Sequence, residues 1–334
     1  MEVLQNSNGQ SLDFDQSFPI LSNIMISGEY DKLSNIKHIQ EYCSNIEHSK
    51  KSKKRACTEY EDNLKHKIFP LINEEIEKFL PDWRDLLQIN DQHINCHTIN
   101  VFYCLINDQD YRLNCSSFER NVLKWAALMH DLKKLSHPFI EGKDHMHPFK
   151  GGKCCLENFQ KLGLIQVKTQ NDLENFERLL TLINESKQPI YNNWRQNMDP
   201  KKSYCLDMHG HHLLSEIFTL LWRDFAPRGS FVDLIFRLVF FHQSLPGLIE
   251  IPPMVQMSPE ERLIYCDTQF FKLIKILMKN DSLSYMFIWD YDGMKHQCMC
   301  EFEDANTKVA KEYKEKRQIL IVDIGNWSNT LEKQ

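Results

Sequence analysis

Apolar positions recur at the spacing of an α-helix along most of the chain between residues 59 and 280. The first such segment ends where Pro81 follows, since proline cannot continue a helix. Capping chemistry at Ser116 marks the start of another helix, which ends at His130. Ser258-Pro259 marks the start of the last. The other predicted helices cover residues 92–107, 147–163, 171–184, 209–225 and 230–243. We therefore expect a mostly α-helical bundle.

The two ends of the chain depart from this pattern. Residues 1–57 are weakly patterned and close on a basic run at 50–55, which indicates a solvated linker or, alternatively, a nuclear-targeting signal. After residue 284 aromatic side chains alternate at period two and Asp292-Gly293 follows, a hairpin signal. The pattern predicts a helical domain over 58–284, with an irregular insertion at 186–207. A small αβ extension with a β-hairpin is predicted over 285–334.

Composition narrows the class of protein. The 334 residues carry a formal net charge of −6, so no basic field favours nucleic acid as a partner. Eleven cysteines without a regular framework indicate free thiols in a reducing compartment. The longest apolar patch, 231–241, is interrupted by Asp233 and Arg237 and is too short to span a bilayer. No secretory signal is visible. We expect a cytoplasmic protein with no membrane partner.

Polar side chains on the apolar faces of several predicted helices indicate a metal centre. His97, His242 and Asp267 each lie in an apolar stripe, and the pair His130-Asp131 ends another helix. Alone, that pair is explained equally well by a His–Asp hydrogen bond that closes the helix. Four helices that each direct an imidazole or carboxylate inward are what a metal site in a bundle requires. This donor set suits Mn, Fe, Co, Ni, Zn or Mg, with positions open for water and substrate.

At this point the sequence resembles the HD-domain superfamily of metal-dependent phosphohydrolases, over roughly residues 90–280. Ala126-Ala127-Leu128-Met129-His130-Asp131-Leu132-Lys133-Lys134 resembles the superfamily signature, with Lys133 where many members have glycine. His97 followed by Val101 resembles the first-histidine helix. Further matching motifs begin at His147 and His242, and Tyr265-Cys266-Asp267 resembles the final aspartate motif. Gln243 stands where a second histidine is more usual.

The resemblance implies roles for particular residues. One divalent ion would be held by His97, His130, Asp131 and Asp267. His147 and His242 would bind a second ion bridged by Asp131 or contact a substrate phosphate. Lys134, and less surely Lys133, would neutralise charge that develops on the phosphoryl oxygens. For both lysines the alternative is a solvated helix end.

Other residues compete for places in this site. His93, four residues before His97, is a second candidate for the first ligand. His209, His211 and His212 either begin a polar helix or line the pocket, where His211 and His212 would contact substrate. Glu185 follows a Leu-Ile pair where some superfamily members place an extra ligand.

The function implied by the resemblance is metal-dependent hydrolysis of a phosphoester, with a metal-activated water as nucleophile. The expected substrate is a small phosphorylated molecule, most of all a nucleotide or cyclic nucleotide, so the activity is that of a phosphohydrolase or phosphodiesterase. Two alternatives stay open. One is a di-iron oxygenase that uses the same six ligands. The other is a non-catalytic module that binds a nucleotide without turnover.

Overall fold

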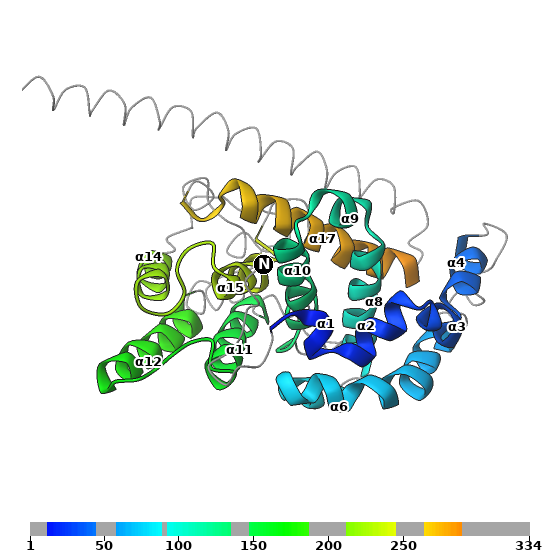
Figure 1. Ribbon diagram of the computed structural model, residues 1–334, viewed down its shortest axis with the longest axis horizontal. Coiled ribbons are helices and arrows are strands. Elements are labelled where there is room, and N and C mark those ends of the chain that lie inside the picture. Colours follow the sequence, from blue (N-terminus) through cyan, green and yellow to red (C-terminus); the bar gives the residue numbers. More distant parts are fainter. Residues whose placement is uncertain are drawn as a thin grey trace, which may run out of the picture.

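The computed structural model describes residues 12–44, 58–88, 92–134, 147–186, 212–244 and 264–288. Helices make up most of this part of the chain and no strand occurs in it, which confirms the mostly helical class (Figure 1). In chain order the elements are α1 (Phe14–Ser17), α2 (Pro19–Ile26), α3 (Glu29–Ser34), α4 (Ile36–Ser44), the π-helical turn η1 (Leu64–Ile68), α6 (Phe69–Phe79), α7 (Asp82–Leu87), α8 (His93–Asn107), α9 (Gln109–Asn114), α10 (Ser117–Met129), α11 (His147–Lys161), α12 (Gln170–Glu185), α14 (His212–Leu220), η4 (Leu221–Phe225), α15 (Phe231–Phe241) and α17 (Thr268–Ile288).

Local chemistry explains several helix ends. The side chain of Ser116 accepts from the backbone N–H of Glu119, and the Glu119 carboxylate accepts from the N–H of Ser116. This capping box starts α10 where the sequence predicts it. Helix α6 ends at Phe79, before Leu80 and Pro81, as expected of proline. The predicted helix over 92–107 corresponds to α8 with a difference of one residue at its start.

Four helices build the centre of the fold. Helix α10 lies between α8 and α15 and contacts both. α17 contacts all three and lies across them in Figure 1. α11 packs on the far side of α15, and α12 and α14 pair beyond it. The carboxyl-terminal ends of α10 and α15, the start of α11 and the interiors of α8 and α17 therefore come together.

The amino-terminal helices share this core. The ring of Phe14 stacks on Phe102 of α8, with 5.1 Å between centroids, and Phe18 meets Trp125 of α10 edge-on at 5.0 Å. Asn121 of α10 accepts from the N–H of Phe14 and donates to the carbonyl of Leu12. The weak pattern in this region therefore hides aromatic anchors, and residues 12–44 pack as part of the body on which the site is built.

The predicted C-terminal β appendage is not supported. Residues 285–288, where the first strand of the hairpin was expected, form the last turn of α17. The buried face of α17 continues at helical spacing from Phe270 to the polar residues Asn280 and Ser284, so helical period governs the stretch that leads into this turn. The rest of the appendage, the basic run at 50–55 and the insertion from residue 187 onward lie outside the described residues. Among the described helices none is long and apolar enough to cross a membrane.

Candidate metal centre

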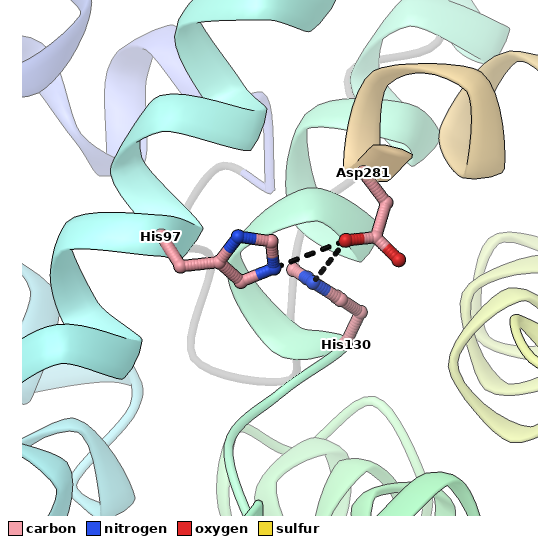
Figure 2. A group of neighbouring side chains, drawn as sticks. All are labelled: His97, His130 and Asp281. Carbon is pink, nitrogen blue, oxygen red and sulfur yellow. Dashed lines mark ion pairs between the residues drawn. The ribbon is translucent and has the colours of Figure 1, made fainter. Parts of the chain in front are cut away.

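Six buried or partly buried side chains converge where these helices meet. His97 comes from α8, Asp281 from α17, and His130 and Asp131 directly follow α10. His147 begins α11 and His242 follows α15. They form two groups whose candidate ligand atoms lie within 4.8 Å of one another: one of His97, His130 and Asp281, and one of Asp131, His147 and His242. Figure 2 shows the first group, with both imidazole rings directed at the Asp281 carboxylate.

Two of the histidines are held by the same local device. His130 and His242 are the C-cap residues of α10 and α15, and each Nδ1 lies within hydrogen-bond distance of the carbonyl oxygen three residues earlier, on Ala127 (2.8 Å) and Val239 (2.7 Å). A carbonyl oxygen only accepts, so Nδ1 carries the proton and donates. The lone pair of each ring is then on Nε2, which is directed into the cluster.

The first group places lone pairs against a carboxylate. The hydroxyl of Ser284 donates to the carbonyl of Asp281 (2.7 Å), so its oxygen accepts from Nδ1 of His97 (2.9 Å) and leaves Nε2 unprotonated. Burial lowers the pKa of His97 to about 4, so the ring is neutral near pH 7. Its Nε2 nevertheless lies 3.0 Å from Oδ1 of Asp281. Two electron pairs at this distance repel each other unless a cation lies between them.

The second group repeats this problem. Nε2 of His147 lies 2.9 Å from Nε2 of His242 and 3.0 Å from Oδ1 of Asp131. Burial, together with the neighbouring histidines, lowers the pKa of His242 to about 3, so this ring is also neutral near pH 7. A single proton on Nε2 of His147 cannot form a full hydrogen bond both to Nε2 of His242 and to Oδ1 of Asp131. A cation satisfies all three atoms together.

Asp131 faces both groups. Its Oδ2 lies 3.4 Å from Nε2 of His97 and 3.5 Å from Nε2 of His130, while Oδ1 faces His147 and His242 at 3.0 and 3.8 Å. Burial opposes ionisation of this fully buried carboxylate. Lys134, whose Nζ lies 2.7 Å from Oδ2, outweighs that effect together with the histidines and holds the pKa well below its usual range. The geometry is that of a bridging carboxylate.

The donor set fits a metal ion. Nε2 of His130, Oδ1 of Asp131 and Oδ1 of Asp281 are buried and have no hydrogen-bond partner of regular geometry in the described part of the chain. Such atoms are costly to bury without a partner. Among the described residues, Lys134 pairs with only one of the two carboxylates, Asp131, and His97 and His242 are neutral, so negative charge is in excess. Imidazole and carboxylate donors with this charge suit a divalent cation.

Two glycines bring α11 close enough for its histidine to join. A Cβ added at Gly152 would lie 2.8 Å from the ring of Phe240 on α15, and one at Gly151 would lie 3.1 Å from the side chain of Val239. The backbones of α11 and α15 therefore approach closely, one turn after His147 and just before His242. Small residues at this crossing set the distance between the two rings.

Asp267 was expected in the ligand set, and the structure places it outside both groups of candidate ligands. Its Oδ2 pairs with the buried guanidinium of Arg237 (3.0 Å) and with Arg228 (3.5 Å), while Oδ1 accepts from the N–H of Phe270 at the start of α17. Asp267 thus caps a helix and neutralises an arginine. The carboxylate that lies among the histidines is Asp281.

The sequence pattern explains this exchange. Asp267 and Asp281 are fourteen residues apart, two heptads, so they fall on nearly the same stripe of one helix. The buried residues Phe270, Ile274 and Leu277 continue that stripe toward Asp281. Helical periodicity alone therefore favours neither carboxylate, and the motif resemblance favoured Asp267. The signal for Asp281 was its place on the continued stripe.

The remaining predicted residues divide. Lys134 contacts Asp131, as required of a residue of the site. Lys133 instead pairs with Asp82 of α7, which also accepts from Cys154 and Asn158 of α11, so it joins three elements rather than facing the cluster. His93 does not join either group. Glu185 is exposed at the end of α12. His212 is the first residue of α14, and its side chain is not among those described. His209 and His211 lie outside the described residues.

The chain matches no protein-family model, no curated protein and no solved structure.

Proposed function

We propose that this chain is a phosphohydrolase of the HD type that uses two divalent metal ions. The observation that carries the proposal is Asp131, whose two oxygens face two separate groups of imidazole nitrogens. A carboxylate in this position is the natural bridge of a two-metal site, and two-metal sites are common among enzymes that cleave phosphoesters. His97, His130 and Asp281 would hold one ion, and His147 and His242 the other.

Bound there, the ions would lower the pKa of a coordinated water and polarise a phosphoryl oxygen. The chain supplies the surroundings. Carbonyl and hydroxyl groups orient His97, His130 and His242 through their Nδ1 protons, so no donor has to reorganise during turnover. Lys134 is 22% exposed beside Asp131, where its ammonium can stabilise negative charge that grows on the phosphoryl oxygens.

A proton donor for the leaving group is available on α8. His93 lies one turn before His97, is 25% exposed and has Nδ1 at 3.0 Å from Oε1 of Glu61. The Glu61 carboxylate orients the His93 ring. We assign to His93 the protonation of the departing oxygen, a role in which a histidine hydrogen-bonded to a carboxylate is effective.

Metal analysis of the purified protein, followed by assays on a panel of phosphoesters, tests the proposal. We expect two divalent ions per chain and metal-dependent release of phosphate or of a nucleoside monophosphate, abolished by a chelator. A protein that takes up no divalent ion overturns the proposal. A bound iron pair that consumes oxygen on a polyol or phosphonate, with no phosphoester cleaved, would assign the di-iron oxygenase alternative instead.

Two variants test the assigned roles. Lys134→Met should slow turnover about 100- to 1,000-fold while both ions stay bound, as expected when one charge-stabilising group is lost. His93→Asn should slow cleavage of an alkyl ester far more than that of a p-nitrophenyl ester, since only the poor leaving group needs a proton. Equal slowing of both esters would remove His93 from this role.

A further inference from the structure

A chain of buried hydrogen bonds connects the first ligand group with the amino-terminal helices. It runs through Tyr30 of α3, Tyr60, Asn100 of α8 and Ser284 of α17 to His97. The exposed fraction is zero for the first four residues and 3% for His97. None of the first four is a ligand candidate. The hydrogen bond between Ser284 and His97 joins residues that are 187 positions apart in the sequence.

The direction of each bond follows from its acceptor. The carbonyl of Ser284 can only accept, so Nδ2 of Asn100 faces it and donates (2.9 Å). Oδ1 of Asn100 then accepts from the hydroxyl of Tyr60 (3.0 Å). Because that proton is used, the hydroxyl of Tyr30 donates to the oxygen of Tyr60 (2.7 Å). The donor and the acceptor of each of these hydrogen bonds are therefore fixed.

Ser284 is where this chain reaches the imidazole. Its hydroxyl proton goes to the carbonyl of Asp281, so its oxygen can only accept the Nδ1 proton of His97. The same residue thus orients the ring of one ligand and holds the backbone of another. Asn100 in turn holds Ser284 against α8, the helix that carries His97.

We propose that Ser284 and Asn100 are positioning residues, which fix the tautomer of His97 and the placement of Asp281 for the first ion, and that Tyr60 and Tyr30 extend this control to α3. The inference rests on the proposed metal site. It also makes a claim about the metal-free protein, because the tautomer of His97 is set by protein groups alone.

The first experiment measures that tautomer. Nitrogen-15 NMR of histidine-labelled, chelator-treated protein distinguishes Nδ1–H from Nε2–H rings, with the His97 signal assigned from a His97→Gln sample. We expect Nδ1–H in the wild type and in Ser284→Thr, and a mixture of tautomers in Ser284→Ala. Ser186→Ala is the matched control, because Ser186 is also buried and donates to the carbonyl three residues earlier but makes no hydrogen bond to a histidine in the described part of the chain. An unchanged tautomer in Ser284→Ala overturns the proposal.

The second experiment measures metal binding by titration with Co²⁺, followed by its visible spectrum. Loss of such a supporting group typically costs 10- to 100-fold in metal affinity, and we expect this loss in Ser284→Ala for one of two ions, with the other unchanged. Tyr60→Phe should give a smaller loss in the same direction. Equal binding in Ser284→Ala and Ser186→Ala would overturn the role in metal binding. If the wild-type protein binds no metal, the proposed function fails, and the NMR experiment still decides the tautomer.

Discussion

Two buried clusters of charged and polar groups involve residues of α15 or its C-cap, and their hydrogen-bonding needs are met in different ways. The first centres on Arg237, which is fully buried and lies over the ring of Phe270 at 4.8 Å. Its guanidinium donates to Asp233, to Asp267 and to the carbonyl of Tyr265. Asp233 in turn accepts from Trp222 and from the N–H of Gly229. In this cluster the donors and acceptors of the protein match one another.

The second cluster, around Asp131, has acceptors in excess. Nδ1 protons of three histidines are used on groups outside it, so their Nε2 lone pairs converge on two carboxylates. Lys134 is the one cation that an ion pair places on these carboxylates among the described residues. Both clusters bury carboxylates, yet only the Arg237 cluster is neutralised by protein groups alone. The difference supports the proposal that the Asp131 cluster binds a cation supplied from outside, whereas the Arg237 cluster joins α15 to the start of α17.

Replacing three carboxylates by asparagine, one at a time, tests this difference most directly. Asp131→Asn should abolish binding of both ions, because the bridge between the groups is lost. Asp281→Asn should weaken one ion, and Asp267→Asn should leave two ions bound, since Asp267 only caps α17 and pairs with arginine. Metal content after gel filtration, with the fold checked by circular dichroism, gives the answer. Loss of metal in Asp267→Asn with a normal fold would restore the ligand set expected from the sequence.

Breaking the cluster that is neutralised from within should affect stability instead. Arg237→Met leaves Asp233 and Asp267 without their buried cation, and removing one partner of a buried pair costs about 3–5 kcal/mol. We expect this loss in the free energy of urea unfolding, with two ions still bound by the folded protein. Arg228→Met is the control, because that arginine is 42% exposed and its loss should cost under about 1 kcal/mol. Equal effects of the two variants would contradict the comparison.

The sequence predicted these clusters unequally, for physical reasons. His97, His130 and His242 were found because an imidazole in an apolar stripe is anomalous whatever its partners are. Arg237 was interpreted only as an interruption of an apolar patch. Its partner Asp233 lies at the local i, i+4 spacing, but its second partner Asp267 lies thirty residues away, where no local pattern pairs them. Because the sequence does not reveal that Asp267 pairs with Arg237, Asp267 was predicted as a ligand and Asp281 was not. Helix boundaries followed from local capping and proline chemistry, whereas the packing of residues 12–44 depends on contacts such as Phe14 with Phe102 that no period reveals.

In the metal-free protein the Asp131 cluster, but not the Arg237 cluster, should make the free energy of unfolding depend on pH between pH 7 and pH 5. The folded-state pKa values of His97 and His242 are lowered to about 4 and about 3, below the 6.5 of a free histidine, so the unfolded chain binds more protons below pH 6.5. Stability is therefore lost as pH falls from 6.5 toward 4. Between pH 7 and pH 5 we expect the free energy of unfolding to fall by about 4 kcal/mol for the two rings together.

Urea unfolding of chelator-treated protein at several pH values measures this loss. A His97→Gln/His242→Gln variant is the control and should show a much flatter profile over the same range. The Arg237 cluster contains no histidine, and burial of Asp267 is outweighed by Arg237, which keeps its pKa below the usual value, so it adds no slope above pH 5. A wild-type profile as flat as that of the variant would mean that the Asp131 cluster also neutralises itself.

The smallest expected effect comes from the crossing of α11 and α15, which touches the Asp131 cluster but not the Arg237 cluster. In Gly152→Ala the new methyl group would lie 2.8 Å from Phe240, and Phe236 stands behind it at 3.1 Å, so one of the rings or helix α11 must move. Overpacking of this kind costs about 1–3 kcal/mol. Because His147 is carried by α11, the ion held with His242 should weaken more than the ion held by His97 and Asp281. In Gly151→Ala the new methyl group would lie 3.1 Å from the side chain of Val239, so we expect a smaller weakening of the same ion. Calorimetric titration resolves the two ions, and equal weakening of both would show that the crossing sets stability alone and does not position His147.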